Sequence, residues 1–389
     1  MTKFVGRTVG FRDRELSMKT LNRRDAIKVV VGASAALYTG CTRGEPPMTK
    51  LAEVQGLVPL PAGAAPWPTR DPFLFCVHHL DLYPKGNAEC GPQASLAGRQ
   101  LGQDFAGIDG WRMYHGATVP GFPSHPHRGF ETVTVVRQGL LDHADSMGAA
   151  ARYGEGDVQW LTAGAGIQHA EMFPLLRQDA DNPVELFQIW LNLPSKDKFA
   201  KPHFSMFWND EVPTLVNEQP GVEMTLVAGR LGEAVPPKPP PESWASASES
   251  DVAIWTVKLQ ADARLVLPPA SDETLRSLYF FEGQSLGIAG QSIGEGNRID
   301  VDGSGTLEVV NGASPAQLLV LQGKPIGEPI VQHGPFVMNS ADEIRQAIMD
   351  YQQTQFGGWP WKRRDPVHGT ERKRFAQFVD GRREEPNAG

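Results

Sequence analysis

The sequence predicts an all-β protein built from two similar β-domains in tandem. Its 389 residues suit two domains, because a domain averages about 150 residues. Glycine and proline are abundant, with 41 and 32 residues, which favours many turns over long helices. Short apolar runs separated by glycine, such as residues 278–283, 303–312 and 317–321, are typical of the strands of a barrel or sandwich.

The first 41 residues differ from the rest and indicate an export signal. Residues 1–40 carry eight Lys/Arg and three Asp/Glu, and residues 29–40 carry no charge. This apolar run is too short for a membrane-spanning helix, which needs about 20 residues. A basic start before a short apolar run fits a cleaved signal, and Arg23 and Arg24 resemble a twin-arginine motif. We expect an exported protein, periplasmic or membrane-anchored, with a cytoplasmic protein as the alternative.

The roles that we predict for the three cysteines depend on whether the protein is exported. Cys41 is a candidate lipidation site, because residues 38–41 loosely resemble a bacterial lipobox, and contact with a membrane is expected only through that lipid. The next segment, 42–70, is rich in proline and alanine and predicts a tether. Cys76 and Cys90 are the other two thiols, and an oxidising compartment would allow them to form a disulfide. Two free buried thiols are the alternative.

Composition also predicts where the domains meet and end. Residues 233–250 are rich in proline, so we expect a long loop between a first domain at 71–232 and a second at 251–332. Residues 333–389 should hold a short helix followed by a basic, solvated tail. Ser340 can cap this helix, with Glu343 at the capping-box position.

Histidine clusters indicate a metal site. Side chains alternate along a strand, so His125, His127 and Glu131 can share one face, and His169 can share a face with Glu171. Three neutral imidazoles and a carboxylate suit one divalent first-row metal such as iron, manganese, nickel or copper. Four protein ligands leave two octahedral positions open, so the centre could be catalytic.

Several stretches resemble the pirin family of the cupin superfamily. Residues 125–133 and 156–172 are similar to its signature, and so are residues 187–194, residues 332–339 and the helix that follows. The resemblance implies two tandem cupin barrels of the jelly-roll type, a short C-terminal helix and a metal in the first barrel alone. Residues 251–330 contain no histidine, which agrees with a second barrel that lacks metal.

The resemblance also assigns roles to the candidate residues. It implies that the metal ligands are His125, His127, His169 and Glu171, and Glu171 could double as a base. Glu131 then supports the site from behind the ligands or forms an ion pair with Arg128. Residues from about 77 to 119 are an insertion relative to the family, which we expect to form a rim loop or a lid.

The function implied by the resemblance is that of a mononuclear metal-dependent dioxygenase similar to quercetin 2,3-dioxygenase. Iron is the metal expected first, and a small aromatic or enolic compound and dioxygen are the expected substrates. The alternative is a non-catalytic metal- or redox-sensing module that acts on a protein partner, and turnover distinguishes the two. A net charge of −8 argues against a nucleic-acid partner.

Overall fold

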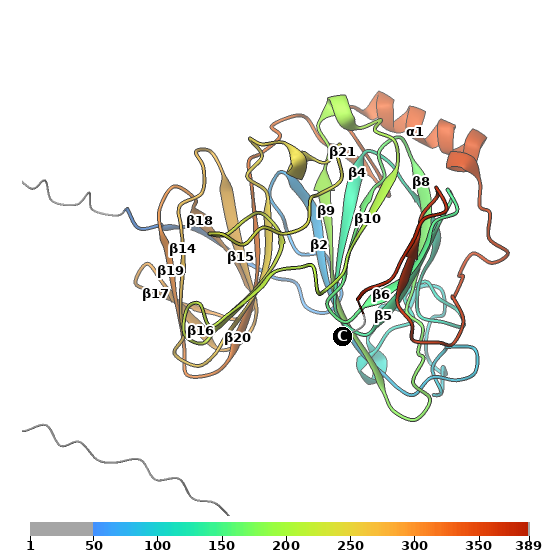
Figure 1. The fold of residues 1–389 in the computed structure, drawn as a ribbon, viewed down its shortest axis with the longest axis horizontal. Helices are drawn as coiled ribbons and strands as arrows, with labels where there is room; N and C mark the ends of the chain where they lie inside the picture. Colours follow the sequence, from blue (N-terminus) through green and yellow to red (C-terminus); the bar gives the residue numbers. More distant parts are fainter. Residues whose placement is uncertain (1–49, 388–389) are drawn as a thin grey trace, which may run out of the picture. The chain divides into compact units, whose positions relative to one another are not determined.

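The structure, a computed structural model, describes residues 50–387 (Figure 1). The expected all-β fold is confirmed, since two β-barrels are followed by one α-helix, α1 (Ala341–Thr354). Within these residues, no helix has both the length and the apolar character needed to cross a membrane. The predicted export signal and Cys41 lie outside the described residues.

The first barrel consists of two antiparallel sheets. Their strand orders are β10-β7-β4-β9-β2 and β24-β23-β6-β5-β8-β3. The strands are β2 (Phe73–Tyr83), β3 (Gly121–His127), β4 (Phe130–Gln138), β5 (Leu140–Asp145), β6 (Ala150–Gly154), β7 (Val158–Thr162), β8 (Ile167–Met172), β9 (Asn182–Asn192), β10 (His203–Phe207), β23 (Phe375–Gln377) and β24 (Arg383–Glu384).

The second barrel also has two sheets, with strand orders β1-β18-β15-β20-β13-β12-β11 and β14-β19-β16-β17. A separate hairpin, β21 with β22, precedes α1. The strands are β1 (Val54–Pro59), β11 (Thr214–Val216), β12 (Val222–Ala228), β13 (Ala253–Leu259), β14 (Arg264–Leu267), β15 (Leu275–Glu282), β16 (Ser285–Ile288), β17 (Gln291–Gly294), β18 (Asn297–Asp302), β19 (Leu307–Asn311), β20 (Ala316–Gly323), β21 (Val331–His333) and β22 (Phe336–Met338).

The five-stranded sheet of the first barrel is covered on both faces. Val133 on β4 packs in a hydrophobic cluster with Ile254 and Leu319 of the second barrel, and Val136 packs in the interior of its own barrel. This explains why β4 reads as a nearly continuous buried run rather than an alternating one. Trp67 completes the contact between the barrels by stacking on Tyr279, with ring centroids 5.6 Å apart.

The predicted tether over 42–70 is wrong for the part that the structure describes. Residues 54–59 form β1, which pairs antiparallel with β18 at the edge of the second barrel. Trp67 is only 5% exposed. The segment is ordered against the barrels because Val54 packs against the core of the second barrel and Trp67 fills the space between the barrels.

Helix α1 begins as the sequence predicts. Ser340 is its N-cap, and its Oγ accepts a hydrogen bond from the backbone N–H of Glu343. The carboxylate of Glu343 in turn accepts a hydrogen bond from the backbone N–H of Asn339. Ile344 and Ala347 are buried against the β21–β22 hairpin. The cap and this apolar face together define where the helix starts and which side it buries.

The basic tail is not the solvated segment that the sequence predicts. Strand β23 pairs with β6, and Ala376 is completely buried. The buried guanidinium of Arg152 pairs with Asp142 at 2.6 Å and donates to the backbone carbonyls of Gly369 and Glu371. Because a buried charge needs such partners, the tail folds back onto the first barrel and supplies them.

Candidate metal centre

Three histidines converge where β3 and β8 pair. The register places His125 directly opposite His169, and His127 lies two residues further along β3. Ring nitrogens of the three lie within 4.8 Å of one another. The clusters meet because their strands are neighbours in one sheet. His127 and His169 are buried, at 3% and 0% exposure.

The polar atoms of this cluster fit a metal ion. Both nitrogens of His169 and Nδ1 of His127 are buried with no hydrogen-bond partner among residues 50–387. Nδ1 of His125 lies 2.9 Å from the carbonyl oxygen of Pro123, so it donates there and leaves Nε2 with a free lone pair. Unpartnered buried nitrogens are costly, and one divalent cation would satisfy several of them at once.

Burial keeps these rings in the form that binds metals. Loss of hydration lowers the pKa of His125 to about 4 and lowers the pKa of His127 and of His169 well below the ordinary value. The neighbouring imidazoles act in the same direction. All three rings are therefore neutral near pH 7, and a metal ion would not have to displace a proton from them.

Glu171 lies beside the histidines and is held by two side chains. Its Oε2 is 3.8 Å from Nε2 of His169 and accepts a hydrogen bond of 2.6 Å from Nε2 of Gln188. Its Oε1 accepts one of 3.1 Å from the hydroxyl of Thr134. Burial raises the pKa of Glu171, and His143 opposes that shift. The carboxylate is thus oriented at the edge of the cluster rather than among its nitrogens.

His143 belongs to this region, although the sequence patterns did not single it out. It lies opposite Glu171 in the pairing of β5 with β8, is fully buried, and has its ring centroid 5.6 Å from that of His169. Its Nδ1 has no partner among the described residues. Strand periodicity could have identified it, because His143 lies two residues from Leu141 and so shares the face of β5 that points into the barrel.

Glu131 lies on the opposite face of β4, so the prediction that it shares a face with the histidines is wrong. Its neighbour Val133 packs between the barrels, whereas Thr134 reaches Glu171 inside the first barrel. The alternation is interrupted because β3 ends before β4 begins, and Gly129 adopts a φ of 85° at the corner.

The predicted ion pair between Glu131 and Arg128 is also wrong. The Glu131 carboxylate accepts hydrogen bonds from Thr162 at 2.6 Å and from Ser243 of the proline-rich loop at 2.5 Å. Burial raises its pKa to about 7. Arg128 instead pairs with Asp350 of α1 at 2.6 Å. Glu131 therefore joins the first barrel to the proline-rich loop, and Arg128 joins it to the helix. This loop connects β12 with β13 inside the second barrel, so the prediction that it separates the two domains is wrong.

The histidine cluster borders a cavity of about 1170 Å³. His125, His127 and Gln188 lie on its wall, and no acidic residue does among those that the structure describes. Two guanidinium groups also line it, those of Arg112 and Arg364. The rest of the wall is largely apolar or aromatic and includes Pro66, Phe75, Val77, Phe105, Phe122 and Trp190.

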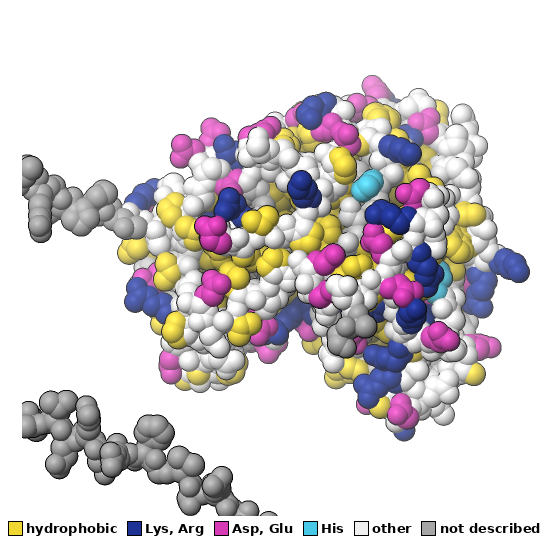
Figure 2. Space-filling model, in the orientation of Figure 1, with side chains coloured by type: hydrophobic (Ala, Val, Ile, Leu, Met, Phe, Trp, Pro, Cys, Tyr) yellow, Lys and Arg dark blue, Asp and Glu magenta, His cyan; other side chains and the backbone are white. Residues whose placement is uncertain are grey.

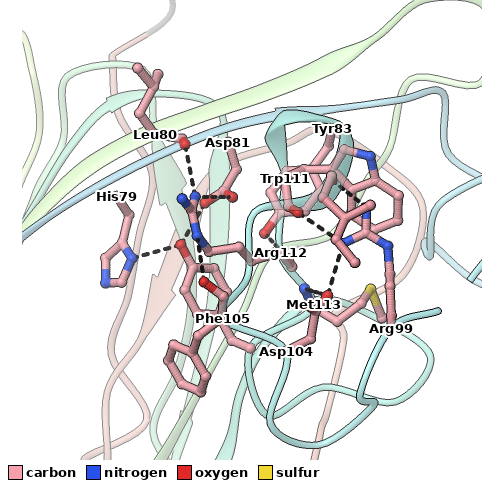
Figure 3. Close-up of polar contacts among 12 residues, drawn as sticks. His79, Leu80, Asp81, Tyr83, Arg99, Asp104, Phe105, Trp111, Arg112 and Met113 are labelled. Atoms are coloured by element: carbon pink, nitrogen blue, oxygen red, sulfur yellow. Dashed lines mark hydrogen bonds and ion pairs between the residues drawn. The ribbon is translucent and has the colours of Figure 1, made fainter. Parts of the chain in front are cut away.

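The inserted segment forms part of this wall. Strand β2 continues to Tyr83, so the segment between β2 and β3, which was predicted to be an insertion, covers residues 84–120 rather than starting near 77. Phe105, Arg112 and His115 bring it to the cavity. Arg112 anchors it to β2, since its guanidinium pairs with Asp81 at 3.0 Å and donates to the carbonyl oxygen of Leu80 (Figure 3). The segment is therefore a rim of the cavity.

The predicted disulfide is absent from the described residues. Cys76 and Cys90 are both free and buried, and they lie in different hydrophobic clusters. Cys76 packs between the two barrels, where burial raises its thiol pKa above the ordinary range. Cys90 packs beside Val119 and Met172. The alternative of two free buried thiols describes the structure.

Comparison with known proteins accounts for both barrels. The pirin family model matches residues 95–191, and the model of the pirin C-terminal cupin domain matches residues 254–357. Human pirin is 33% identical over 255 residues, which cover 63% of this chain and 80% of the human protein. A Pseudomonas aeruginosa protein provisionally named quercetin 2,3-dioxygenase is 36% identical over 236 residues, covering 61% of this chain and 79% of that protein.

A solved structure extends the comparison. Quercetin 2,3-dioxygenase from Acinetobacter baumannii is similar with a TM-score of 0.63 and 25% identity, over 79% of this chain and 99% of that chain. The two-barrel fold and the sequence matches to both domains identify the same family. The chain belongs to the pirin family of cupin proteins.

Proposed function

We propose that this protein is a mononuclear metal-dependent dioxygenase that acts on a small phenolic or enolic compound. The observation that carries the proposal is a group of three neutral histidines beside a carboxylate, with His125 and His127 on the wall of a largely apolar cavity. Such a cavity with a few convergent polar groups suits a small-molecule site. The names of the Pseudomonas and Acinetobacter relatives point to the same chemistry.

His125, His127, His169 and Glu171 would hold the metal, with iron expected first and manganese, nickel or copper as alternatives. A divalent ion bound there would supply a Lewis-acid and redox centre with positions open to a phenolate and to dioxygen. The protein contributes orientation. The carbonyl of Pro123 fixes the tautomer of His125, and a carboxylate with hydrogen bonds to both oxygens keeps one geometry.

Glu171 also offers a place for the substrate's proton. Burial raises the pKa of its carboxyl group, so it accepts a proton more readily than an exposed glutamate. Thr134 and Gln188 hold its two oxygens. We expect a phenolic hydroxyl that enters from the cavity to transfer its proton to this carboxylate, and the neutral histidines to stay fixed.

The cavity wall favours a flat, electron-rich substrate. Phe75 and Trp190 stack on each other with ring centroids 4.7 Å apart, and both line the cavity. Aromatic walls exclude water and can pack against a planar ring. With Arg112 and Arg364 on the wall and no acidic residue among the described lining, an ionised phenol is favoured over a cation.

Oxygen uptake by metal-loaded protein tests this proposal. With quercetin or catechol, we expect metal-dependent uptake that His169→Ala abolishes and that His333→Ala leaves unchanged. His333 is the matched control because it is exposed on β21 and is not among the residues that line the cavity. Metal-loaded protein that consumes no oxygen with either compound would contradict the proposal and favour the non-catalytic sensing module.

Export is a separate proposal, because residues 1–41 lie outside the described residues. It is supported by Arg23 and Arg24 ahead of a run that carries no charge. Twin-arginine transport moves folded proteins, which suits a protein that binds its metal before export. Changing both arginines to lysine should leave the precursor inside the cell, as fractionation and immunoblotting would show. Unchanged delivery to the envelope would refute a twin-arginine signal.

A further inference from the structure

His79 lies on the cavity wall outside the metal centre, and its ring is held by hydrogen-bonded neighbours. We propose that His79 accepts a hydrogen bond from a hydroxyl group of the substrate other than the one at the metal, and so determines specificity for polyhydroxylated rings. The inference rests on the proposed function for the class of ligand, and it adds where the second polar end of that ligand binds.

His79 is placed on the same wall as the metal centre. It lies on β2, two residues from Val77, and Val77 pairs with Gln188, whose amide holds Glu171. His79 is 4% exposed and lines the cavity. The ring of Phe122 is 5.8 Å from that of His79 and 6.4 Å from that of His125. The ring of Phe122 therefore lies between the two histidines, and a planar ligand that packs on it could reach both.

The hydrogen bonds around His79 fix its tautomer. The hydroxyl of Tyr114 donates to Oδ2 of Asp81 at 2.6 Å, and Arg112 occupies Oδ1 of the same carboxylate at 3.0 Å. A tyrosine has one hydroxyl proton, so Tyr114 can only accept at its 2.8 Å contact with Nδ1 of His79. Nδ1 must carry the proton, and Nε2 is left as a bare acceptor.

Nothing in the protein uses that acceptor. Among the described residues, none forms a hydrogen bond with Nε2 of His79. Figure 3 shows the contact that its other ring nitrogen makes. Burial lowers the pKa of His79 to about 3, so the ring is neutral near pH 7 and Nε2 acts as an acceptor rather than as a cation. A purely structural histidine would need only its Nδ1 contact. A free Nε2 on a cavity wall suits a ligand that brings a hydroxyl donor.

The arrangement is reinforced from the inserted segment. Arg112 and Tyr114 both come from residues 84–120, and they meet Asp81 from β2 at a buried position. Tyr83 donates its hydroxyl to the carbonyl oxygen of Arg112, which ties the end of β2 to the same segment. The insertion thus builds the support of His79, in addition to forming the rim of the cavity.

Ligand discrimination in the absence of oxygen tests the inference. We would measure binding of quercetin and of 3-hydroxyflavone, which shares the ring skeleton and the enol but lacks the remote hydroxyls, to metal-loaded protein by fluorescence quenching. One buried neutral hydrogen bond predicts roughly tenfold tighter binding of quercetin. In His79→Phe this ratio should fall to about one, while the affinity for 3-hydroxyflavone is retained.

His78→Phe is the matched control, because His78 is the neighbouring histidine on the other face of β2 and pairs with Glu185. It should keep the quercetin preference. Tyr114→Phe should weaken the preference, because it removes the hydroxyl that keeps the proton of His79 on Nδ1. Nitrogen NMR of histidine-labelled protein should show Nε2 of His79 as the unprotonated nitrogen, with the signal lost in His79→Phe.

An unchanged quercetin preference in His79→Phe, or a proton on Nε2, would overturn the inference. Neither readout depends on turnover. A protein that discriminates through His79 but consumes no oxygen would refute the dioxygenase proposal alone, and a protein that consumes oxygen without this discrimination would refute the role of His79 alone.

Discussion

The two barrels share an architecture but fill their interiors differently. In the second barrel, the core is an apolar cluster in which residues such as Leu278 and Phe280 are completely buried. In the first barrel, the strand pair β3–β8 gathers three histidines beside Glu171, and His125 and His127 lie on the wall of a large cavity. The same fold therefore encloses an apolar core in the second barrel and a candidate metal site in the first.

The difference is also visible in the polar atoms that the protein leaves without a partner. Of 14 buried side-chain nitrogens and oxygens without a hydrogen bond in the described part of the chain, nine belong to residues of the first barrel. Both nitrogens of His169 are among them. Such costs are expected where a ligand completes the site. Surface charge does not distinguish the two barrels in the same way, since acidic and basic side chains are interspersed on the face in view (Figure 2).

The largest expected effect is loss of packing in the second barrel. Phe280→Ala should reduce the free energy of unfolding by about 3–5 kcal/mol, because it empties a fully buried aromatic site. Urea denaturation would measure it. Val310→Ala, at a position 42% exposed on β19, should cost well under that. Equal costs at the two positions would show that the second barrel is not held by its apolar core.

The next effect is the pH dependence of stability that buried Glu131 should cause. A glutamate in the unfolded chain ionises near its ordinary pKa of 4.5, whereas folded Glu131 stays protonated up to about pH 7. The folded state binds more protons in that window, so stability should fall as the pH rises through it, by about 3 kcal/mol.

In Glu131→Gln, this part of the pH dependence should disappear. Urea midpoints of both proteins at about pH 5 and about pH 8 would show it. Gln can still accept a hydrogen bond from Thr162 or Ser243, so the fold should be retained. Parallel pH curves for the two proteins would mean that the Glu131 carboxyl has an ordinary pKa.

A smaller effect should separate two threonines on the same strand of the first barrel. Thr134 donates to Glu171, while the buried hydroxyl of Thr132 has no partner in the described structure. Thr134→Val should weaken metal retention by about 10–100-fold, as loss of a supporting hydrogen bond does at metal sites. Thr132→Val should leave it unchanged. Competition with a chelator would measure both, and equal losses would argue against Glu171 as a ligand.

Patterns within single segments were sufficient to predict much of the fold. Gly-punctuated apolar runs predicted the strands of the second barrel, and Ser340 with Glu343 predicted the start of α1. The alternation of His125 and His127 and of His169 and Glu171 predicted the two pairs that the register brings together. These features are local, because each depends on the period of one strand or on one turn of helix.

What the sequence did not reveal depends on contacts between distant segments. Residues 54–59 read as a tether because their partner strand lies more than 200 residues away. The tail read as solvated because the buried Arg152 that it satisfies is far from it in sequence. Glu131 was placed on the wrong face because a corner at Gly129 interrupts the alternation. His79 gained its role from Tyr114 on the insertion.

Metal content per folded chain tests whether the first barrel holds a single metal centre. We expect one metal ion per chain in the unaltered protein and almost none in His169→Ala, with circular dichroism showing both to be folded. Elemental analysis of dialysed protein would provide the number. Two metal ions per chain, or undiminished metal in His169→Ala, would contradict the assignment of a single centre to the first barrel.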